Sequence, residues 1–115
     1  MKALLIRKEK ANIFRDTLLL KGIEFYEERD NFHFLFIFPR QDDFSEAGYK
    51  TSYLLDESVD EVEVSGTTFK IVGSHEAIAN FANKFENRGL KAKMDNPDNL
   101  IEIKRWGSKY LVSVS

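Results

Sequence analysis

The stretch KGIEFYEERDNFHFLFIFP (residues 21–39) has a counterpart of equal length in RGLKAKMDNPDNLIEIKRW (residues 88–106). Each stretch reads as a glycine, an apolar run, a polar turn and a second apolar run. The correspondence continues towards the N-terminus without a gap, so that residues 2–39 align with residues 69–106. Identical residues at matching positions are Glu9 and Glu76, Phe14 and Phe81, and Gly22 and Gly89. The chain is therefore expected to contain two similar halves.

Two amphipathic helices are predicted by apolar residues at spacings of three and four, one over Glu9–Lys21 and one over Ser74–Arg88. Their apolar stripes are Ala11, Phe14 and Leu18 in the first helix and Ile78, Phe81, Ala82 and Phe85 in the second. Gly22 and Gly89 follow the helices, where a glycine closes the last turn in the left-handed conformation without a Cβ clash. Ser74 is the expected N-cap of the second helix.

Short apolar runs bounded by polar turns predict strands around both helices. The expected strands are Lys2–Arg7, Ile23–Glu28, Phe32–Phe38 and Glu61–Ser65 in the first half, and Thr68–Val72, Leu90–Met94, Leu100–Arg105 and Lys109–Val114 in the second. This order predicts an α+β fold with two tandem β-α-β-β(-β) repeats of ferredoxin-like type. We expect an antiparallel or mixed sheet with both helices on one face.

The predicted repeats form one domain over residues 1–115, with halves at about 1–65 and 67–115. A long acidic loop at 39–60 breaks the symmetry, with a short helical or extended piece expected around Tyr49–Leu55. A chain of 115 residues is long enough to bury a sizeable core without covalent staples.

Composition limits the chemistry and the compartment. The chain has no cysteine, which excludes disulfides and thiol nucleophiles and fits a reducing cytoplasm. The N-terminus has too short an apolar run for a signal peptide, and no run of 18 apolar residues occurs, so a soluble cytoplasmic protein without membrane partners is expected.

The formal net charge is −2, and the acidic side chains crowd the middle of the chain. They are Asp42, Asp43, Glu46, Asp56, Glu57, Asp60, Glu61 and Glu63. Such a belt repels phosphate, and a basic stripe could be formed only by Lys91, Lys93, Lys104 and Arg105. Nucleic acid is therefore predicted to be an unlikely partner.

Strand alternation assigns side chains to the two faces of the sheet. Phe34 and Phe36, like Ile101 and Ile103, are expected to pack under the helices. The opposite face is expected to be uncovered and to hold a small, partly apolar ligand. Its predicted ligand-binding residues are Tyr26, His33, Leu35, Glu102 and Trp106. A second subunit, another protein or the 39–60 loop could cover this face instead, so a homodimer is one expectation.

The turn at residues 95–99 and the strand after it resemble the closing signature of the vicinal oxygen chelate superfamily, the glyoxalase and bleomycin-resistance proteins. Members often read aspartate-proline-aspartate-glycine-asparagine, two further residues and a glutamate, and Glu102 takes the place of that glutamate. In this chain the glycine is absent and Asn96 stands before the proline. Residues 12–25 also resemble the helix-to-strand passage of that family. The resemblance implies paired β-α-β-β-β modules.

In metal-dependent members of that superfamily, the glutamate at the position of Glu102 is a metal ligand. Histidine, glutamine or glutamate on the first strand of each half completes the site. The corresponding stretches here, residues 2–7 and 68–72, offer no such side chain on the interior face. One carboxylate does not hold a divalent ion tightly, so neither a metal nor another cofactor is expected.

Sequence motifs for catalysis are absent. The chain has no serine elbow, phosphate loop or dinucleotide fingerprint, so no catalytic residue is predicted and an enzyme is less expected than a binding protein. The preferred hypothesis is a metal-free, non-catalytic binding module. The alternative is a protein-interaction or inhibitor module that docks its acidic loop on a basic protein partner, through Asp42, Asp43, Phe44, Glu46 and Tyr49.

Overall fold

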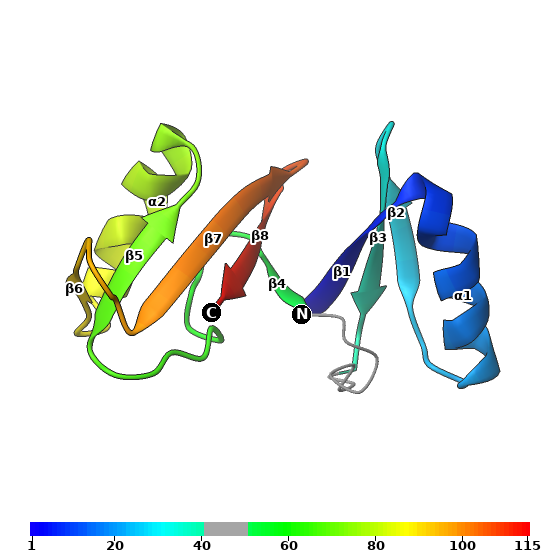
Figure 1. Cartoon of the computed structure of the whole chain (residues 1–115), viewed down its shortest axis with the longest axis horizontal. Helices are drawn as coiled ribbons and strands as arrows, with labels where there is room; N and C mark the ends of the chain where they lie inside the picture. Colours follow the sequence, from blue (N-terminus) through cyan, green and yellow to red (C-terminus); the bar gives the residue numbers. More distant parts are fainter. Residues whose placement is uncertain (41–50) are drawn as a thin grey trace. The chain divides into compact units, whose positions relative to one another are not determined.

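A computed structural model describes residues 1–40 and 51–115 (Figure 1). The chain has an α+β fold that divides into two compact units, Met1–Ser52 and Tyr53–Ser115. No helix in the described ranges is long and apolar enough to cross a membrane.

Unit 1 contains one helix and a three-stranded antiparallel sheet. Its elements are β1 (Lys2–Arg7), the 3-10 turn η1 (Lys8–Lys10), α1 (Ala11–Leu20), β2 (Tyr26–Arg29) and β3 (His33–Phe38). β3 is the central strand, since it pairs with β1 on one side and with β2 on the other. The predicted strand, polar turn and strand after Gly22 are confirmed as a hairpin.

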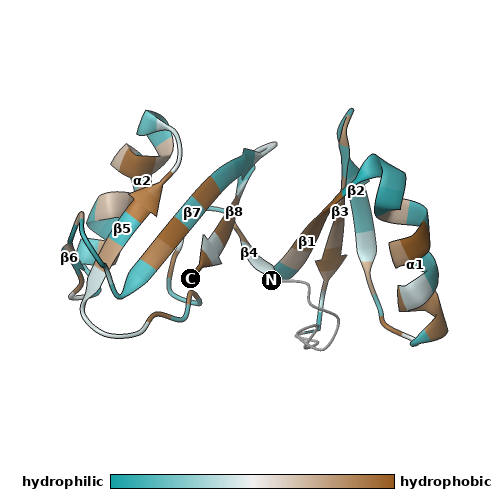
Figure 2. Ribbon diagram, viewed as in Figure 1, coloured by the Kyte–Doolittle hydropathy of each residue, from teal (hydrophilic) through white to brown (hydrophobic). Residues whose placement is uncertain are grey.

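Aromatic packing holds α1 on this sheet. Phe36 is fully buried, and its ring meets Phe14 of α1 edge-on at a centroid distance of 5.0 Å. Ala11 and Leu18 complete the buried stripe of the helix, which confirms the predicted apolar face. Figure 2 shows the corresponding hydrophobic bands on β1, β3 and α1. The helix ends as expected, because Gly22 has a φ of 69° and the N–H of Ile23 donates to Leu18 O at 3.0 Å.

The face of unit 1 opposite α1 differs from the sequence prediction. The register pairs Leu5 with Leu35 and Ala3 with Ile37 on that face. Leu35 is 0% exposed and Ile37 is 7% exposed, so the prediction that these side chains lie on an uncovered surface is wrong. Strand alternation correctly placed Leu35 and Ile37 on the face opposite α1. Whether that face is buried depends on what covers it, and the alternation pattern does not contain this information.

Unit 2 contains a mixed sheet and the second helix. Its elements are β4 (Ser52–Leu55, beginning at the unit boundary), β5 (Thr68–Val72), α2 (His75–Glu86), β6 (Lys91–Ala92), β7 (Asn99–Trp106) and β8 (Lys109–Val114). The strand order is β4-β8-β7-β5-β6. β5 pairs in parallel with both β6 and β7, whereas β8 pairs antiparallel with β7 and β4.

The core of unit 2 lies between α2 and the sheet. Phe81 and Phe85 of α2 are fully buried, together with Ile101 of β7, and the Phe81 ring meets Tyr110 edge-on at 4.9 Å. The predicted N-cap is confirmed, because the Ser74 hydroxyl accepts a hydrogen bond from the N–H of Ala77 at 3.1 Å. Glu102 and Lys104 are exposed on the other face, as alternation predicts.

Two predicted features of unit 2 are wrong. The strand-turn-strand segment after Gly89 is not a hairpin, since β6 and β7 lie on opposite sides of β5. No strand occurs at Glu61–Ser65. Val59 and Val62 are both buried, and the Val62 N–H donates to Val59 O at 3.1 Å. Two buried residues three positions apart fit a turn, whereas in a strand buried residues would alternate. Of the extended piece expected around Tyr49–Leu55, residues 49 and 50 lie outside the described residues, and Ser52–Leu55 form β4.

Candidate functional site

The exposed face of the unit 2 sheet, opposite α2, gathers lysines from three neighbouring strands. Thr68, Lys70 and Val72 alternate with the buried Phe69 and Ile71 on β5. β6 presents Lys91 beside Thr68, with Lys93 two positions further on, and β7 presents Lys104. We call Lys70, Lys91, Lys93 and Lys104 the lysine face.

The carboxylates near the lysine face include Glu102 of β7 and Asp98, whose charge interacts with that of Lys93. Glu102 is the only carboxylate among the strand residues of β5, β6 and β7, all of which lie in the described part of the chain. Arg105 lies on the other face of β7, and its Nη1 donates to Glu76 Oε1 of α2 at 3.1 Å. By the strand register Lys93 lies beside Lys70, whereas Lys104 lies two residues beyond the partner of Val72, so the four ammonium groups are spread along this face.

Asn99 positions the strands that carry these lysines. This residue is 1% exposed, and its side-chain amide bonds backbone groups of Ser65, before β5, and of Thr68, the first residue of β5. The Asn99 Oδ1 accepts from Ser65 N–H at 2.9 Å, while Nδ2 donates to the carbonyl oxygens of Ser65 and Thr68. The start of β7 is thereby tied to the start of β5, which explains why the turn at 95–98 leads past β5 and does not fold back on β6.

Asp98 reinforces this connection from the exposed side. Its Oδ2 accepts from the N–H groups of Thr67 and Thr68 at 2.8 and 3.2 Å, and its own N–H donates to the Thr68 hydroxyl at 2.8 Å. The Thr67 bond is the leading cause that lowers the pKa of the Asp98 carboxyl, with further lowering from Thr68 and from the charge of Lys93. Gly66 has a φ of 59° and lies so close that a Cβ there would collide with the Asp98 side chain.

Acid is expected to weaken this connection. A carboxyl whose pKa is lower when folded contributes stability above its unfolded pKa, here 3.8, and that contribution is lost as the pH falls through the folded value. Asp98→Asn should therefore reduce the fall in unfolding free energy between about pH 5 and pH 2. Urea denaturation at several pH values measures it. The control is Asp95→Asn in the same turn; an unchanged pH dependence in Asp98→Asn contradicts the assignment.

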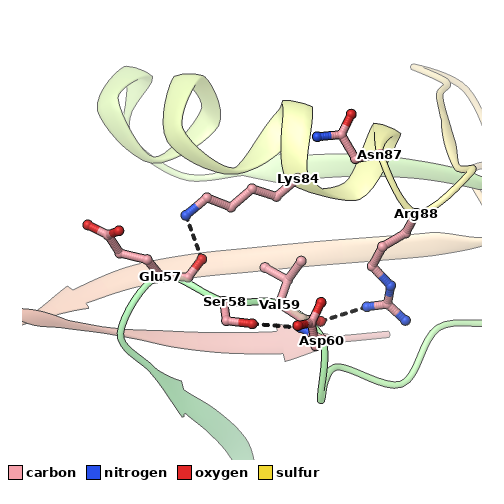
Figure 3. Close-up of a pocket in the computed structure, with 7 residues that line it drawn as sticks. All are labelled: Glu57, Ser58, Val59, Asp60, Lys84, Asn87 and Arg88. Atoms are coloured by element: carbon pink, nitrogen blue, oxygen red, sulfur yellow. Dashed lines mark hydrogen bonds between the residues drawn. The ribbon is translucent and has the colours of Figure 1, made fainter.

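A second group of cations in unit 2 is engaged with the backbone. Lys84 and Arg88 line a pocket of about 460 Å³ between α2 and the loop at residues 57–60 (Figure 3). Lys84 Nζ donates to Glu57 O, and Arg88 Nη1 donates to the carbonyl oxygens of Val59 and Val62 at 2.7 and 2.8 Å. These donors hold the loop on the core, so the pocket is better explained as a structural clamp than as an anion site.

The ligand-binding residues predicted from sequence fall in both units. Tyr26 and His33 lie in unit 1 on the same face as the buried Leu35, while Glu102 and Trp106 lie on the exposed face of β7 in unit 2. Tyr26 pairs with Ile37, four residues along β3 from His33, so these two side chains are not cross-strand neighbours. His33 instead lies beside Asp30, with Nδ1 3.6 Å from Oδ1.

The predicted protein-docking residues lie outside the described residues. They are Asp42, Asp43, Phe44, Glu46 and Tyr49. The rest of the acidic belt is described, and Glu57, Asp60 and Glu63 are exposed. No group of three or more histidine, aspartate or glutamate side chains in residues 1–40 and 51–115 could hold a metal ion.

Sequence reasoning found three of the four lysines and missed Lys70. It grouped Lys91, Lys93 and Lys104 with Arg105, which the strand register places on the opposite face. The pattern that could have identified Lys70 is the alternation within β5, where it stands between the buried Phe69 and Ile71 and so points to the opposite face. Pairing of β5 with β6 and β7 was not foreseen, so Lys70 had no predicted neighbours.

Two solved structures resemble this chain in fold. One is a 4-thiouridine synthetase in complex with RNA and ATP, with 13% identity and a TM-score of 0.63 over 100% of this chain and 41% of that one. The other is PH1313 from Pyrococcus horikoshii Ot3, with 13% identity and a TM-score of 0.68 over 99% of this chain and 54% of that one. The chain thus spans about half the length of either structure. No family model and no curated protein matches it.

Proposed function

We propose that the chain is a binding module whose lysine face binds single-stranded nucleic acid through its phosphates. The observation that carries this proposal is the placement of half-buried Lys70 and exposed Lys91, Lys93 and Lys104 on one sheet face, where Glu102 is the only carboxylate among the described strand residues of β5, β6 and β7. Lysines that neutralise phosphates release counterions, and this supplies sequence-independent affinity.

The spread of charge favours a polymer over one small anion. The lysines come from three strands, and each ammonium is a separate point charge on a flexible stem. A chain with several phosphates can meet all four, whereas a single phosphate cannot. Trp106 is the aromatic side chain on this face of β7 and is half-buried, so stacking of bases contributes little. We therefore infer weak sequence preference and strong salt dependence.

The structural neighbours support this proposal only through the fold. The 4-thiouridine synthetase was solved with RNA, and 41% of that chain has the fold of the present one. The proposal departs from the sequence prediction that nucleic acid is an unlikely partner. That prediction weighed the acidic belt at 42–63 against scattered lysines; what favours the present proposal is the register of β5, β6 and β7, which puts the lysines on one face.

Binding of a fluorescein-labelled 20-nucleotide RNA of mixed sequence tests the proposal. Four phosphate contacts predict a slope of log affinity against log salt of about −0.7 per contact, or about −3 in total. Lys91→Glu with Lys93→Glu removes two contacts, so the slope should fall to about half and affinity at 50 mM salt should drop at least about tenfold. Fluorescence anisotropy between about 50 and 200 mM salt measures both.

The matched control is Lys10→Glu with Lys21→Glu, which makes the same change in net charge at exposed positions flanking α1. It should leave the slope unchanged. No RNA binding at the lowest salt, or equal weakening by the two double variants, contradicts the proposal. DNA of the same sequence should bind similarly, because the contacts are to phosphates.

The tandem-repeat interpretation of the fold is also kept as a proposal. Both units contain a strand, a helix and two strands in the same order, and both helices are followed by a glycine with positive φ. Their sheets differ, because β1 pairs antiparallel with β3 whereas β5 pairs in parallel with β7. A duplication would therefore have been followed by a change of strand pairing in one half.

A further inference from the structure

The edge of β5 beside β6 is only partly covered. β6 pairs with Thr68 and Phe69 alone, and the last hydrogen bond along this edge among the described residues is Lys93 N–H to Phe69 O at 2.9 Å. Ile71 lies two residues after Phe69 on β5, so its N–H and C=O point towards the side of β5 on which β6 lies. The strand therefore continues past its partner with pairing groups available.

An apolar groove of about 200 Å³ lies at this free edge. Its lining includes Lys70, Ile71, Ile78, Ala92, Lys93 and Met94. Ile78 of α2 is 37% exposed and Met94 is 74% exposed. A cavity of about 150 Å³ accepts a benzene-sized group, so this groove has room for one large apolar side chain.

Charge distinguishes the two sides of the groove. On the side of α2 the lining is apolar, with Ile78 and Ala82 from the helix facing Ile71 and Ala92 of the sheet. On the opposite side Lys70 and Lys93 are the charged residues of the lining, and none of the lining residues is acidic. An added strand alternates its side chains between these sides. The fitting strand thus alternates apolar and acidic residues.

We propose that the free edge of β5 binds an extended acidic–apolar peptide segment of a partner protein by strand addition. The Ile71 N–H and C=O pair with the peptide backbone, one apolar side chain enters the groove beside Ile78, and flanking carboxylates meet Lys70 and Lys93. Main-chain pairing supplies affinity and the alternate side chains supply specificity in this mode of recognition. The inference is independent of nucleic-acid binding, although both ligands would compete for Lys70 and Lys93.

The probe is an acetylated, amidated five-residue peptide with the sequence Val-Glu-Phe-Glu-Val, titrated into nitrogen-15-labelled protein. We expect saturable shifts of the Ile71, Ile78 and Met94 amides below about 1 mM peptide. Hydrogen exchange of the Ile71 amide should slow on binding. A peptide of the same composition, Glu-Glu-Phe-Val-Val, breaks the alternation and should bind at least about tenfold more weakly.

Variants separate this site from the lysine face. Ile78→Ser should weaken the peptide at least about tenfold and leave RNA binding unchanged because it adds no charge beside Lys70 and Lys93, whereas Asn80→Ser, exposed on the same helix, should change neither. Absence of shifts at 1 mM peptide, equal binding of the rearranged peptide, or full affinity in Ile78→Ser overturns the proposal. Saturable binding of octanoate without binding of the peptide also overturns it, because the groove would then hold a small apolar acid.

Discussion

Replacing Phe36 with alanine is expected to lower the free energy of unfolding by about 4 kcal/mol, since truncation of a buried phenylalanine costs about 3–5 kcal/mol. Phe36 is 0% exposed and lies at the centre of the core of unit 1. Its ring contacts Phe14 at 5.0 Å and Phe25 at 5.7 Å, both edge-on, and stacks on Phe34 at 6.5 Å, so the change removes these aromatic contacts and leaves a cavity. Urea denaturation followed by far-ultraviolet circular dichroism measures the loss.

The chain offers a matched control four residues away. Phe32 is 73% exposed, and the contacts that hold it are made by its backbone, since its N–H donates to Asp30 Oδ1 and its carbonyl accepts from Lys8 N–H. Phe32→Ala keeps those bonds and should change stability by less than about 0.5 kcal/mol. Similar losses for Phe32→Ala and Phe36→Ala are the result that refutes this account of the core.

The second large effect is expected at Asn99. Asn99→Leu has similar volume but leaves Ser65 N–H and the carbonyl oxygens of Ser65 and Thr68 without their side-chain partner. Each buried polar group that loses its partner costs about 1–3 kcal/mol. Because the backbone groups of exposed Ser65 can bond to water instead, we expect the free energy of unfolding to fall by about 3 kcal/mol in total. Fluorescence of Trp106, the one tryptophan of the chain and part of the same strand, reports the transition.

Two further substitutions separate hydrogen bonding from packing at this position. Asn99→Asp keeps the acceptor for Ser65 N–H but turns a donor into an oxygen that faces two carbonyls, so it should be as harmful as Asn99→Leu at neutral pH. Asn80→Leu on the exposed surface of α2 should be nearly neutral. Full stability in Asn99→Asp would show that shape, and not the donated bonds, accounts for the role of Asn99.

Local patterns predicted the helices well because a helix is decided by nearby residues. The stripe of Ala11, Phe14 and Leu18 is buried, and Ser74 caps α2 as expected. In the second helix the stripe was less accurate, since Ile78 is partly exposed and Ala77 is buried in its place. Strand alternation likewise assigned Ile101 and Ile103 to the core and Glu102 and Lys104 to the exposed face.

The candidate site could not be predicted in the same way, because it depends on which strands become neighbours. Lys70 and Lys104 are far apart in sequence and share a surface only because β5 pairs with β7. The sequence-predicted site joined His33 and Leu35 to Glu102, residues that lie in different units, and Leu35 proved to be buried. The repeat suggested a hairpin after Gly89, but β6 and β7 flank β5 in the structure.

The amino-acid sequence by itself determined the α+β class, the two glycine-terminated helices, most of the strands and the side of the strands that packs against the helices. These follow from helical and strand periodicity and from local hydrogen bonds. Tertiary structure alone decided the parallel pairing around β5, the burial of Leu35 and the gathering of the lysine face. Strand pairing is settled by long-range hydrogen bonds, such as those of Asn99 to Ser65 and Thr68, whose partners no local pattern specifies.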